Sequence, residues 1–312
     1  MKIFAVVGPT ASGKSALALE LAKRYNGEII SCDSMQIYKK MDIGTAKPTA
    51  EELAVVPHHM IDVVEPTQSF SCADYVEMAD GIVRDVISRG KLPIFCGGTG
   101  LYLDSLLRGK NFDEGLTDET LRRELLDFAA TNGAEALHKE LKAIDPESAE
   151  AIHPNNVKRV ARAIEIYRLS GITKTEIDRR SQKSERRFEI SAVELHYSWR
   201  EKLYERIDRR VDIMIEQGLI EETRALYEDG IFEVNSTAAQ AIGYKELLGY
   251  IRGEETLGNA LERLKMSTRR YAKRQMTWFA SKDYITRLDV CSQQGQKTFE
   301  DIVNNTASLF FN

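Results

Sequence analysis

Short apolar runs separated by amphipathic stretches mark the first third of the chain. The runs at 2–7, 28–32 and 92–96 have the length and residue types of buried β-strands, and helical patterns lie between them. Alternation of this kind predicts a parallel sheet with helices on its faces. The run at 188–195 is also strand-like, and the run at 284–290 predicts an additional edge strand.

The stretch 113–186 has a different pattern. It contains no convincing strand, shows helical periodicity and is dense in charge, whereas the chain beyond residue 200 is almost wholly helical. We therefore predict an α/β fold whose core, 1–112 and 187–312, is interrupted by a helical insertion domain and ends in a helical C-terminal half. No internal repeat is visible.

Composition narrows the function classes only slightly. The chain has 312 residues, 43% of them hydrophobic, and a net charge of -5, so any binding to nucleic acid would depend on local basic clusters. No apolar run reaches the length of a signal peptide or a membrane span, which predicts a cytoplasmic protein. Four cysteines without a C-x-x-C pair predict neither zinc nor disulfides, and Cys32 and Cys96 lie in strand-like runs, where we expect them to be buried.

The segment "GPTASGKS" matches the nucleotide-binding pattern G-x-x-x-x-G-K-[ST] and lies between a predicted strand and a predicted helix. Its glycines let backbone N–H groups surround a phosphate, Lys14 adds a positive charge, and Ser15 can ligate Mg²⁺. The phosphate-binding candidates are Gly8, Pro9, Thr10, Ala11, Ser12, Gly13, Lys14 and Ser15. The pattern predicts a P-loop NTPase-like core but does not identify the molecule that carries the phosphate.

A second group of polar residues follows the next strands. Asp33 comes directly after 28–32, and Thr99 lies in the glycine-rich turn after 92–96. Ligands of open α/β sheets bind at the carboxyl ends of the strands, so we expect Lys14, Asp33 and Thr99 around one pocket. Asp33 could instead cap a following helix. The strand 92–96 ends in "GGTGLY", without the carboxylate that an ATPase usually places there.

Eight segments occur in order along nearly the whole chain: "GPTASGKS", "DSMQIYKKMDIGTAKPT", "PHHMIDVVEPTQSFSCADY", "GGTGLYLDSLL", "NNVKRVARAIEIY", "WREKLYERIDRRVDIMIEQGLIEE", "QAIGYKEL" and "TRRYAKRQMTWF". Together they resemble the bacterial tRNA dimethylallyltransferases, the tRNA isopentenyltransferase family. The resemblance implies transfer of a dimethylallyl group from dimethylallyl diphosphate to the N6 amine of the adenosine 3′ of the anticodon, position 37. The implied acceptors are tRNAs that read codons beginning with U, and diphosphate is released without ATP hydrolysis.

The same resemblance implies roles for individual residues. The loop at 8–15 holds the diphosphate of the donor, with Mg²⁺ at Ser15, and Asp33 acts as general base on the adenine amine. Thr99 lies beside the target base. One arginine of "YERIDRRVD" contacts the diphosphate, and we favour Arg210 over Arg206. The plain alternative for that motif is an exposed charged face in which these arginines pair with Asp208 and Asp212.

The expected partner is the anticodon stem-loop of tRNA, gripped by the insertion domain, and the protein is expected to act as a monomer away from membranes. Basic clusters lie at 158–162, 178–187 and 263–274, although any single one could be a solvated helix face. The tRNA-contacting candidates are Asp33, Ser34, Met35, Gln36, Thr99, Arg122, Arg123, Lys158, Arg159, Arg162, Lys245, Arg269, Arg270, Lys273 and Arg274. We expect Tyr271 and Trp278 in the core, and His58 and His59, whose side chains would alternate along a strand, in packing.

Three other functions remain open at the level of sequence. A P-loop kinase would also have an Asp after its second strand, but it would not explain the basic helical C-terminal half. An adenylate isopentenyltransferase, which prenylates free AMP or ADP, would have a similar core but would not need the basic clusters. A non-catalytic P-loop switch that binds RNA would tolerate Asp33→Asn.

Overall fold

The computed structural model describes residues 1–108, 117–183, 186–234 and 237–311. The chain divides into two compact units, Met1–Leu106 with Phe188–Asn312 and Leu107–Arg187. We call the first the core unit and the second the insertion unit; the sequence placed the insertion at 113–186. Among the described helices, none is both long enough and apolar enough to cross a membrane.

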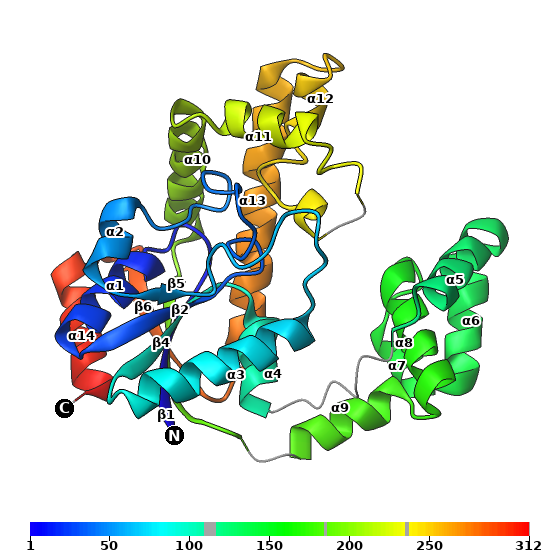
Figure 1. The fold of residues 1–312 in the computed structure, drawn as a ribbon, viewed down its shortest axis with the longest axis horizontal. Coiled ribbons are helices and arrows are strands. Elements are labelled where there is room, and N and C mark those ends of the chain that lie inside the picture. The colour runs from blue at the N-terminus through cyan, green and yellow to red at the C-terminus, as the bar shows by residue number, and fades with distance from the viewer. Residues whose placement is uncertain (109–116, 184–185, 235–236, 312) are drawn as a thin grey trace. The chain divides into compact units, whose positions relative to one another are not determined.

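A sheet of seven strands organises the described part of the core unit, in the order β3-β2-β4-β1-β5-β6-β7 (Figure 1). Its strands are β1 (Lys2–Val7), β2 (Gly27–Cys32), β3 (His58–His59), β4 (Leu92–Gly97), β5 (Glu189–Tyr197), β6 (Ile285–Ser292) and β7 (Gly295–Gln296). All neighbours pair in parallel except β6 and β7. The parallel α/β prediction is confirmed, but β6 is not the edge strand, because β7 pairs beyond it.

Apolar residues at every position of β1 after Lys2 reflect its place in the middle of this sheet. Strands covered on both faces are hydrophobic throughout, and "KIFAVV" is buried from its second residue onward. On one face, α1 (Lys14–Arg24) and α14 (Phe299–Phe310) pack against Phe4 and Val6. Phe311 stacks on Tyr25 with ring centroids 3.9 Å apart, so residues from the two ends of the sequence share one apolar cluster.

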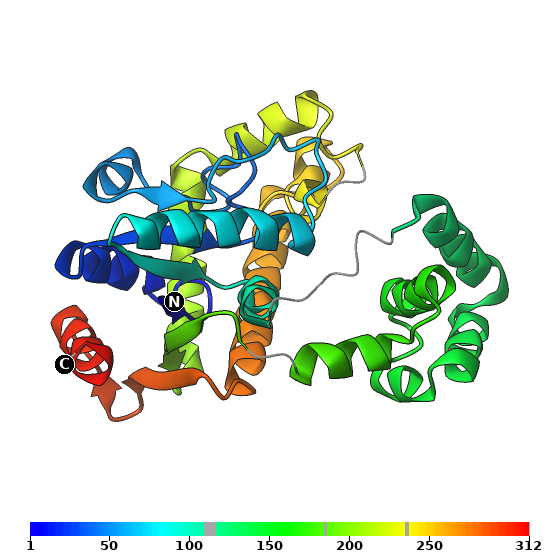
Figure 2. The ribbon, with the colours of Figure 1, turned by 60° about the horizontal axis from the view of Figure 1, so that its bottom comes forward.

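The helices after β5 form the second part of the core unit: α10 (Arg200–Glu216), α11 (Leu219–Glu228), the short α12 (Leu248–Ile251) and α13 (Leu257–Ala280). Helices α10 and α13 lie side by side (Figures 1 and 2). Ion pairs of 2.8 Å between Arg269 and Asp208 and of 2.6 Å between Lys265 and Asp212 connect them. The alternative that paired these two acids with arginines of their own helix is therefore wrong.

Three further helices complete the core unit: α2 (Ala50–Val55), α3 (Cys72–Ser88) and α4 (Gly100–Arg108). The start of α3 is fixed by a capping box in which Ser71 and Asp74 satisfy each other's backbone N–H groups. Its buried face includes Tyr75, which stacks on Tyr102 of α4 at 4.0 Å between ring centroids. These contacts place α4, and with it the Thr99 turn, against the sheet edge where the strands end.

The insertion unit is helical throughout its described part, as its sequence pattern predicts, and has an apolar core of its own. Its helices are α5 (Glu119–Asn132), α6 (Ala134–Ile144), α7 (Pro146–Ala151), α8 (Val157–Ser170) and α9 (Lys174–Lys183). Leu137, Leu141, Val160 and Ile164 are fully buried among α5, α6 and α8. The buried carboxylate of Asp145 caps α7 and accepts hydrogen bonds from Thr175, which connects α7 to α9.

Candidate active site

The loop Gly8–Ser15 joins β1 to α1 in a conformation that depends on its glycines. Gly8 has φ +145° and Gly13 has φ +95°, values that side chains disfavour, and a Cβ at Gly8 would lie 3.0 Å from the Leu195 carbonyl oxygen. Lys14 folds back over the loop and donates to the Pro9 carbonyl at 3.3 Å. The loop therefore presents a charged side chain and a helix N-terminus to the same space, which suits an anion.

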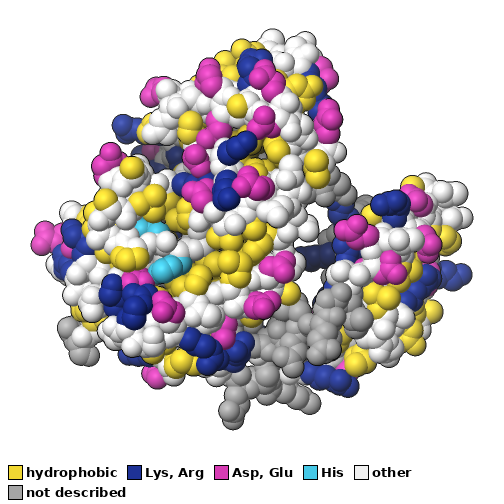
Figure 3. Space-filling view, in the orientation of Figure 1, with side chains coloured by type: hydrophobic (Ala, Val, Ile, Leu, Met, Phe, Trp, Pro, Cys, Tyr) yellow, Lys and Arg dark blue, Asp and Glu magenta, His cyan; other side chains and the backbone are white. Residues whose placement is uncertain are grey.

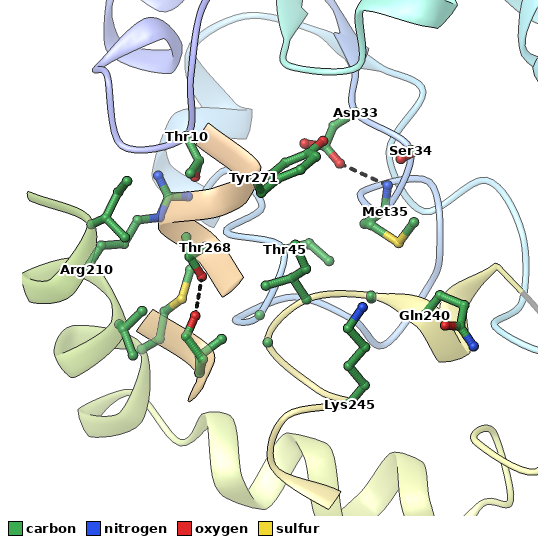
Figure 4. Close-up of a pocket in the computed structure, with 18 of the residues that line it drawn as sticks. Thr10, Asp33, Ser34, Met35, Thr45, Arg210, Gln240, Lys245, Thr268 and Tyr271 are labelled. Carbon is green, nitrogen blue, oxygen red and sulfur yellow. Dashed lines mark hydrogen bonds between the residues drawn. The ribbon is translucent and has the colours of Figure 1, made fainter. Parts of the chain in front are cut away.

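Two cavities meet above this loop. The smaller, of about 80 Å³, is lined by the loop residues Lys14 and Ser15 together with Asp33 and Arg210. The larger, of about 270 Å³, is shown in Figure 4 and is bounded by α10, α13 and the loops after β2. Both cavities are lined by Thr10, Asp33, Thr45, Arg210 and Tyr271. The strand ends thus bring Lys14 and Asp33 to one pocket, as expected.

Two cations of the small cavity are desolvated. Burial lowers the pKa of Lys14, and the nearby Arg210 lowers it further, whereas Cys96 and Asp33 oppose the change. Burial likewise lowers the pKa of Arg210, with Asp33 opposing. Charges held in a poorly solvated site without a matching number of anions are costly unless a ligand neutralises them. A multiply charged anion such as diphosphate meets that requirement.

Asp33 stands where the cavities join. Its Oδ1 accepts a hydrogen bond from the Met35 N–H at 2.9 Å, and no other hydrogen bond to its carboxylate is present within the described residues. The chain after Asp33 forms turns and not a helix, so the helix-cap alternative is wrong. Figure 4 shows the carboxylate beside the Tyr271 ring at one end of the large cavity. One carboxylate oxygen is therefore available to a ligand.

Thr99 supports the Asp33 turn from behind. Its Oγ1 accepts from the Ser34 N–H at 3.1 Å and its own N–H donates to the Cys32 carbonyl at 3.0 Å. Thr99 is not among the residues that line either cavity. The sequence-based role beside a target base therefore stays a prediction, whereas its contact with the Asp33 turn is a feature of the structure.

Arg210 and Arg206 have separate surroundings although both lie on α10. Arg210 lines both cavities, and its guanidinium lies beside Thr10 in Figure 4. Arg206 donates from Nε to the Ala11 carbonyl at 2.9 Å and lies over the Tyr197 ring. Arg210 is thus placed to contact an anion in the small cavity, and Arg206 braces the outside of the phosphate loop.

The three residues after Asp33 contribute to different parts of the pocket. Ser34 and Met35 line the large cavity, and Gln36 lines the small one. The Gln36 amide is already occupied, because it donates to the carbonyls of Thr45 and Ala46 and accepts from the Ser31 hydroxyl. Gln36 therefore shapes the loop around Thr45, a role that its expected contact with tRNA did not foresee.

Helix α13 supplies residues that the sequence did not assign to the pocket. Tyr271, expected in the core, lines both cavities, and burial raises the pKa of its hydroxyl, which stays protonated. Gln275 accepts from the Thr10 N–H at 2.9 Å and donates to the Gly98 carbonyl at 3.2 Å, so it connects the phosphate loop to the turn after β4. Trp278 packs on Gly100, where a Cβ would lie 2.2 Å from its ring, but it is only partly buried and does not belong to the buried core in which it was expected.

The predicted tRNA contacts of the core unit fall into two groups. Lys245 and Arg274 are exposed and line the large cavity, and Lys245 points into it in Figure 4. Arg270 and Lys273 are exposed outside both linings. Arg269 instead pairs with Asp208 and holds α13 against α10.

In the insertion unit, two of the arginines predicted to contact tRNA instead pair with a buried carboxylate. Arg122 makes a bidentate contact with the fully buried Glu165 at 3.0–3.1 Å, and Arg162 pairs with the same group at 2.9 Å. Because a buried carboxylate needs such partners, these two arginines stabilise the fold of the unit. The remaining candidates, Arg123, Lys158 and Arg159, are exposed.

Cys32, Cys96 and the adjacent histidines make contacts within the protein that account for their positions. Burial raises the pKa of the Cys96 thiol to about 11, although this residue also lines the small cavity. Cys32 is buried, as expected. His59 contacts the buried Glu28 at 2.8 Å, and His58 hydrogen-bonds the Val56 carbonyl, so the two rings face different partners.

The oxygen atoms that line the small cavity fit a magnesium ion that binds together with the phosphate groups of a substrate. The Ser15 hydroxyl and the Asp33 carboxylate line this cavity, and both are oxygen ligands. The described residues contain no group of three or more His, Cys, Asp or Glu that could hold a metal ion alone. Mg²⁺ commonly uses one or two protein oxygens plus phosphate oxygens, so a bound diphosphate would complete the site.

Comparison with known proteins agrees with this geometry. The family model for IPP transferase matches residues 36–282, and the model for isopentenyl transferase matches residues 1–64. The chain belongs to the IPP transferase family. Among curated family members, a tRNA dimethylallyltransferase of Halalkalibacterium halodurans is 47% identical over 303 residues, 97% of this chain and 96% of the relative. One from Geobacillus thermodenitrificans is 50% identical over 289 residues, 93% and 90% of the two chains.

Solved structures of the family share the fold. The tRNA isopentenylpyrophosphate transferase of Bacillus halodurans aligns with a TM-score of 0.71 and 43% identity, over 99% of this chain and 95% of that one. A eukaryotic dimethylallyltransferase described as acting on tRNA aligns with a TM-score of 0.82 and 31% identity, over 99% of this chain and 77% of that one. The P-loop NTPase-like core expected from the sequence is that of the family.

Proposed function

We propose that the protein is a tRNA dimethylallyltransferase. It transfers a dimethylallyl group from dimethylallyl diphosphate to N6 of adenosine 37 in tRNAs that read codons beginning with U. The observation that carries the proposal is the junction of two cavities at Asp33, one lined by desolvated cations and the other by a tyrosine ring and exposed basic residues. The names of the relatives support the same reaction.

In this proposal the small cavity takes the diphosphate of the donor. Lys14, Arg210 and the N–H groups at the start of α1 contact its oxygens. As the bond between the allylic carbon C1 and the diphosphate oxygen breaks, both electrons leave with the diphosphate. Fixed positive groups stabilise the developing charge without having to reorganise, which lowers the barrier. A bound Mg²⁺ at Ser15 would add a further positive charge at the leaving group.

The acceptor adenine enters the large cavity. The base must leave the stacked anticodon loop, at a cost of about a few kcal/mol that contacts with the tRNA backbone supply. Its N6 nitrogen forms the new bond to C1, and Asp33 accepts the proton that N6 loses. Lys245 and Arg274, exposed at the wall of this cavity, are placed to contact the phosphates beside the flipped base.

The insertion unit is proposed to grip the anticodon stem-loop. Its contribution comes from Arg123, Lys158 and Arg159, which are exposed, and not from the two arginines committed to Glu165. We further propose that the enzyme acts as a monomer in the cytoplasm, where its tRNA substrates are found.

Prenylation of free AMP is the second candidate function, because it needs the same donor site. The exposed cations of the large cavity and of the insertion unit favour tRNA, since a free nucleotide offers them no extended phosphate backbone. A kinase is disfavoured because it would leave these same groups without a role.

A transfer assay tests the proposal. Protein is incubated with Mg²⁺, radiolabelled dimethylallyl diphosphate and tRNA, with parallel reactions that contain AMP in place of tRNA or labelled ATP in place of the donor. We expect label in tRNA at adenosine 37 and none in AMP. Label in AMP would make the enzyme an adenylate prenyltransferase, and phosphate transfer from ATP with inert tRNA would overturn the proposal altogether.

A further inference from the structure

The loop Asp42–Ala46 forms part of the wall of both cavities. Gly44 lines the large cavity, Ala46 lines the small one, and Thr45 lines both. The backbone at Ala46 is left-handed, with φ +48°, a conformation that costs a residue other than glycine about 1–3 kcal/mol. Such a loop keeps its shape only when contacts from elsewhere hold it.

A carboxylate nearly 180 residues away in the sequence provides these contacts. Glu222, in the first turn of α11, accepts the backbone N–H groups of Asp42 at 3.0 Å, Ile43 at 2.9 Å and Gly44 at 3.1 Å. The Tyr244 hydroxyl also donates to Glu222, at 2.7 Å. A carboxylate accepts about four hydrogen bonds, so Glu222 is fully occupied in this task.

Tyr244 connects this loop to a second segment that lines the large cavity. Its ring is fully buried against Gly44, where a Cβ would lie 2.4 Å from Cζ. Burial and the neighbouring Glu222 raise the pKa of Tyr244, so its hydroxyl remains a donor. The adjoining residues 240–243 and Lys245 also line the large cavity, and Gly243 lies directly against Gly44, where a Cβ would be 3.4 Å from the Gly44 carbonyl oxygen. Glu222 and Tyr244 thus hold together two adjacent segments that line one cavity.

We propose that Glu222 and Tyr244 form a latch that fixes the shape of this wall of the large cavity for the acceptor base, with Glu222 as a positioning residue. The inference rests on the proposed function, in which this cavity takes the adenine. The latch touches neither Lys14 nor Ser15. The loop that it holds reaches the small cavity only through Thr45 and Ala46, so the charged groups proposed to bind the diphosphate stay in place. Loss of the latch allows Thr45 to move away from Asp33 without unfolding the core.

Glu222→Gln is the sharpest test, because the side chain keeps its size but replaces one acceptor oxygen with an NH₂ group that faces N–H donors. We expect kcat/KM for tRNA to fall about tenfold or more, while binding of inorganic diphosphate stays at the wild-type level. Hydrogen exchange of the amides of Asp42, Ile43 and Gly44 should accelerate about tenfold or more. The exposed neighbour on the same helix gives the matched control, Glu221→Gln, which should change none of these quantities.

Gly44→Ala tests the same latch from the other side, since it leaves Glu222 intact but places a Cβ in the Tyr244 ring. It should reproduce the loss in kcat/KM, again with normal diphosphate binding. Unchanged amide protection in Glu222→Gln would overturn the latch, and lost protection with wild-type kinetics would overturn its positioning role. If the wild-type protein transfers no dimethylallyl group to tRNA, the proposed function fails, whereas amide exchange still decides whether the latch exists.

Discussion

At the scale of single residues, the candidate site consists of opposite charges that the fold holds close together with little solvent. Burial lowers the pKa of Lys14 and of Arg210, whereas the nearby Asp33 carboxylate raises the pKa of both. The three groups line one small cavity, so an anion bound there lies close to all three. Each can be tested by a change that preserves its shape.

Asp33→Asn removes the negative charge but keeps the Oδ1 atom that accepts from Met35. We expect turnover to fall by about 10²- to 10⁴-fold, because the amide cannot accept the N6 proton. Binding of tRNA and the unfolding temperature should stay close to wild type, as measured by filter binding and calorimetry. Retained turnover would remove Asp33 as the base.

The lowered pKa of Lys14 predicts a pH dependence of diphosphate binding. Only the protonated amine attracts the anion, so affinity should weaken as pH rises, at a lower pH than for an ordinary lysine. In Lys14→Arg the guanidinium stays charged, and the fall should move to higher pH. Titration of inorganic diphosphate by calorimetry between about pH 7 and 11 measures both curves. Coinciding curves would contradict this role for Lys14.

Whether a site residue could be predicted from the sequence depends on its position in the chain. Asp33 directly follows β2, and Lys14 begins the helix after the loop that follows β1, so their meeting at one sheet edge could be predicted. Tyr271 and Gln275 line the pocket, and Glu222 holds its wall, only through contacts between residues far apart in sequence. A helical pattern cannot show which partner a polar side chain will meet, and the choice between Arg206 and Arg210 needed the structure for the same reason.

At the scale of elements, α13 serves two functions on different faces. Tyr271 and Gln275 face the pocket, whereas Arg270 and Lys273 are exposed. Its sequence was read as a basic cluster because exposed and inward-facing residues alternate within each turn. The two-residue strands β3 and β7 were also missed, since segments of that length have no hydrophobic period.

Helix α5 offers a matched pair of arginines. Arg122→Ala removes a bidentate partner of the buried Glu165, so we expect the free energy of unfolding to fall by about 1–3 kcal/mol. Arg123→Ala should leave stability unchanged and weaken tRNA binding about threefold or more, because this exposed side chain is proposed to contact a phosphate. Chemical denaturation and tRNA titration of both variants compare the two roles. The opposite pattern would reverse the assignments.

At the scale of the whole molecule, charge is distributed and not concentrated. The net charge is -5, and Figure 3 shows Lys and Arg side chains interspersed with Asp and Glu on the face in view. In the proposed function, attraction of tRNA therefore depends on a few exposed cations near the pocket and on those of the insertion unit. Some arginines of the sequence clusters, such as Arg269, are used inside the protein.

Salt dependence measures how many cations remain for tRNA. Several phosphate contacts predict that affinity falls about tenfold or more between low and moderate ionic strength. Lys158→Ala combined with Arg159→Ala should reduce the slope of log affinity against log salt by about 2. An affinity that does not respond to salt would contradict the proposed grip on the stem-loop.

The joining of residues from opposite ends of the sequence in one apolar cluster has a consequence for synthesis on the ribosome. Strand β1 emerges before the other strands of the sheet but lies between β4 and β5, and Phe310 and Phe311, which cover it, are made after all of these strands. At about 5–20 residues per second, β1 waits many seconds for its neighbours. The insertion unit, made from one continuous segment, can fold during that interval, whereas the catalytic core becomes complete only when residues 299–311 have left the exit tunnel.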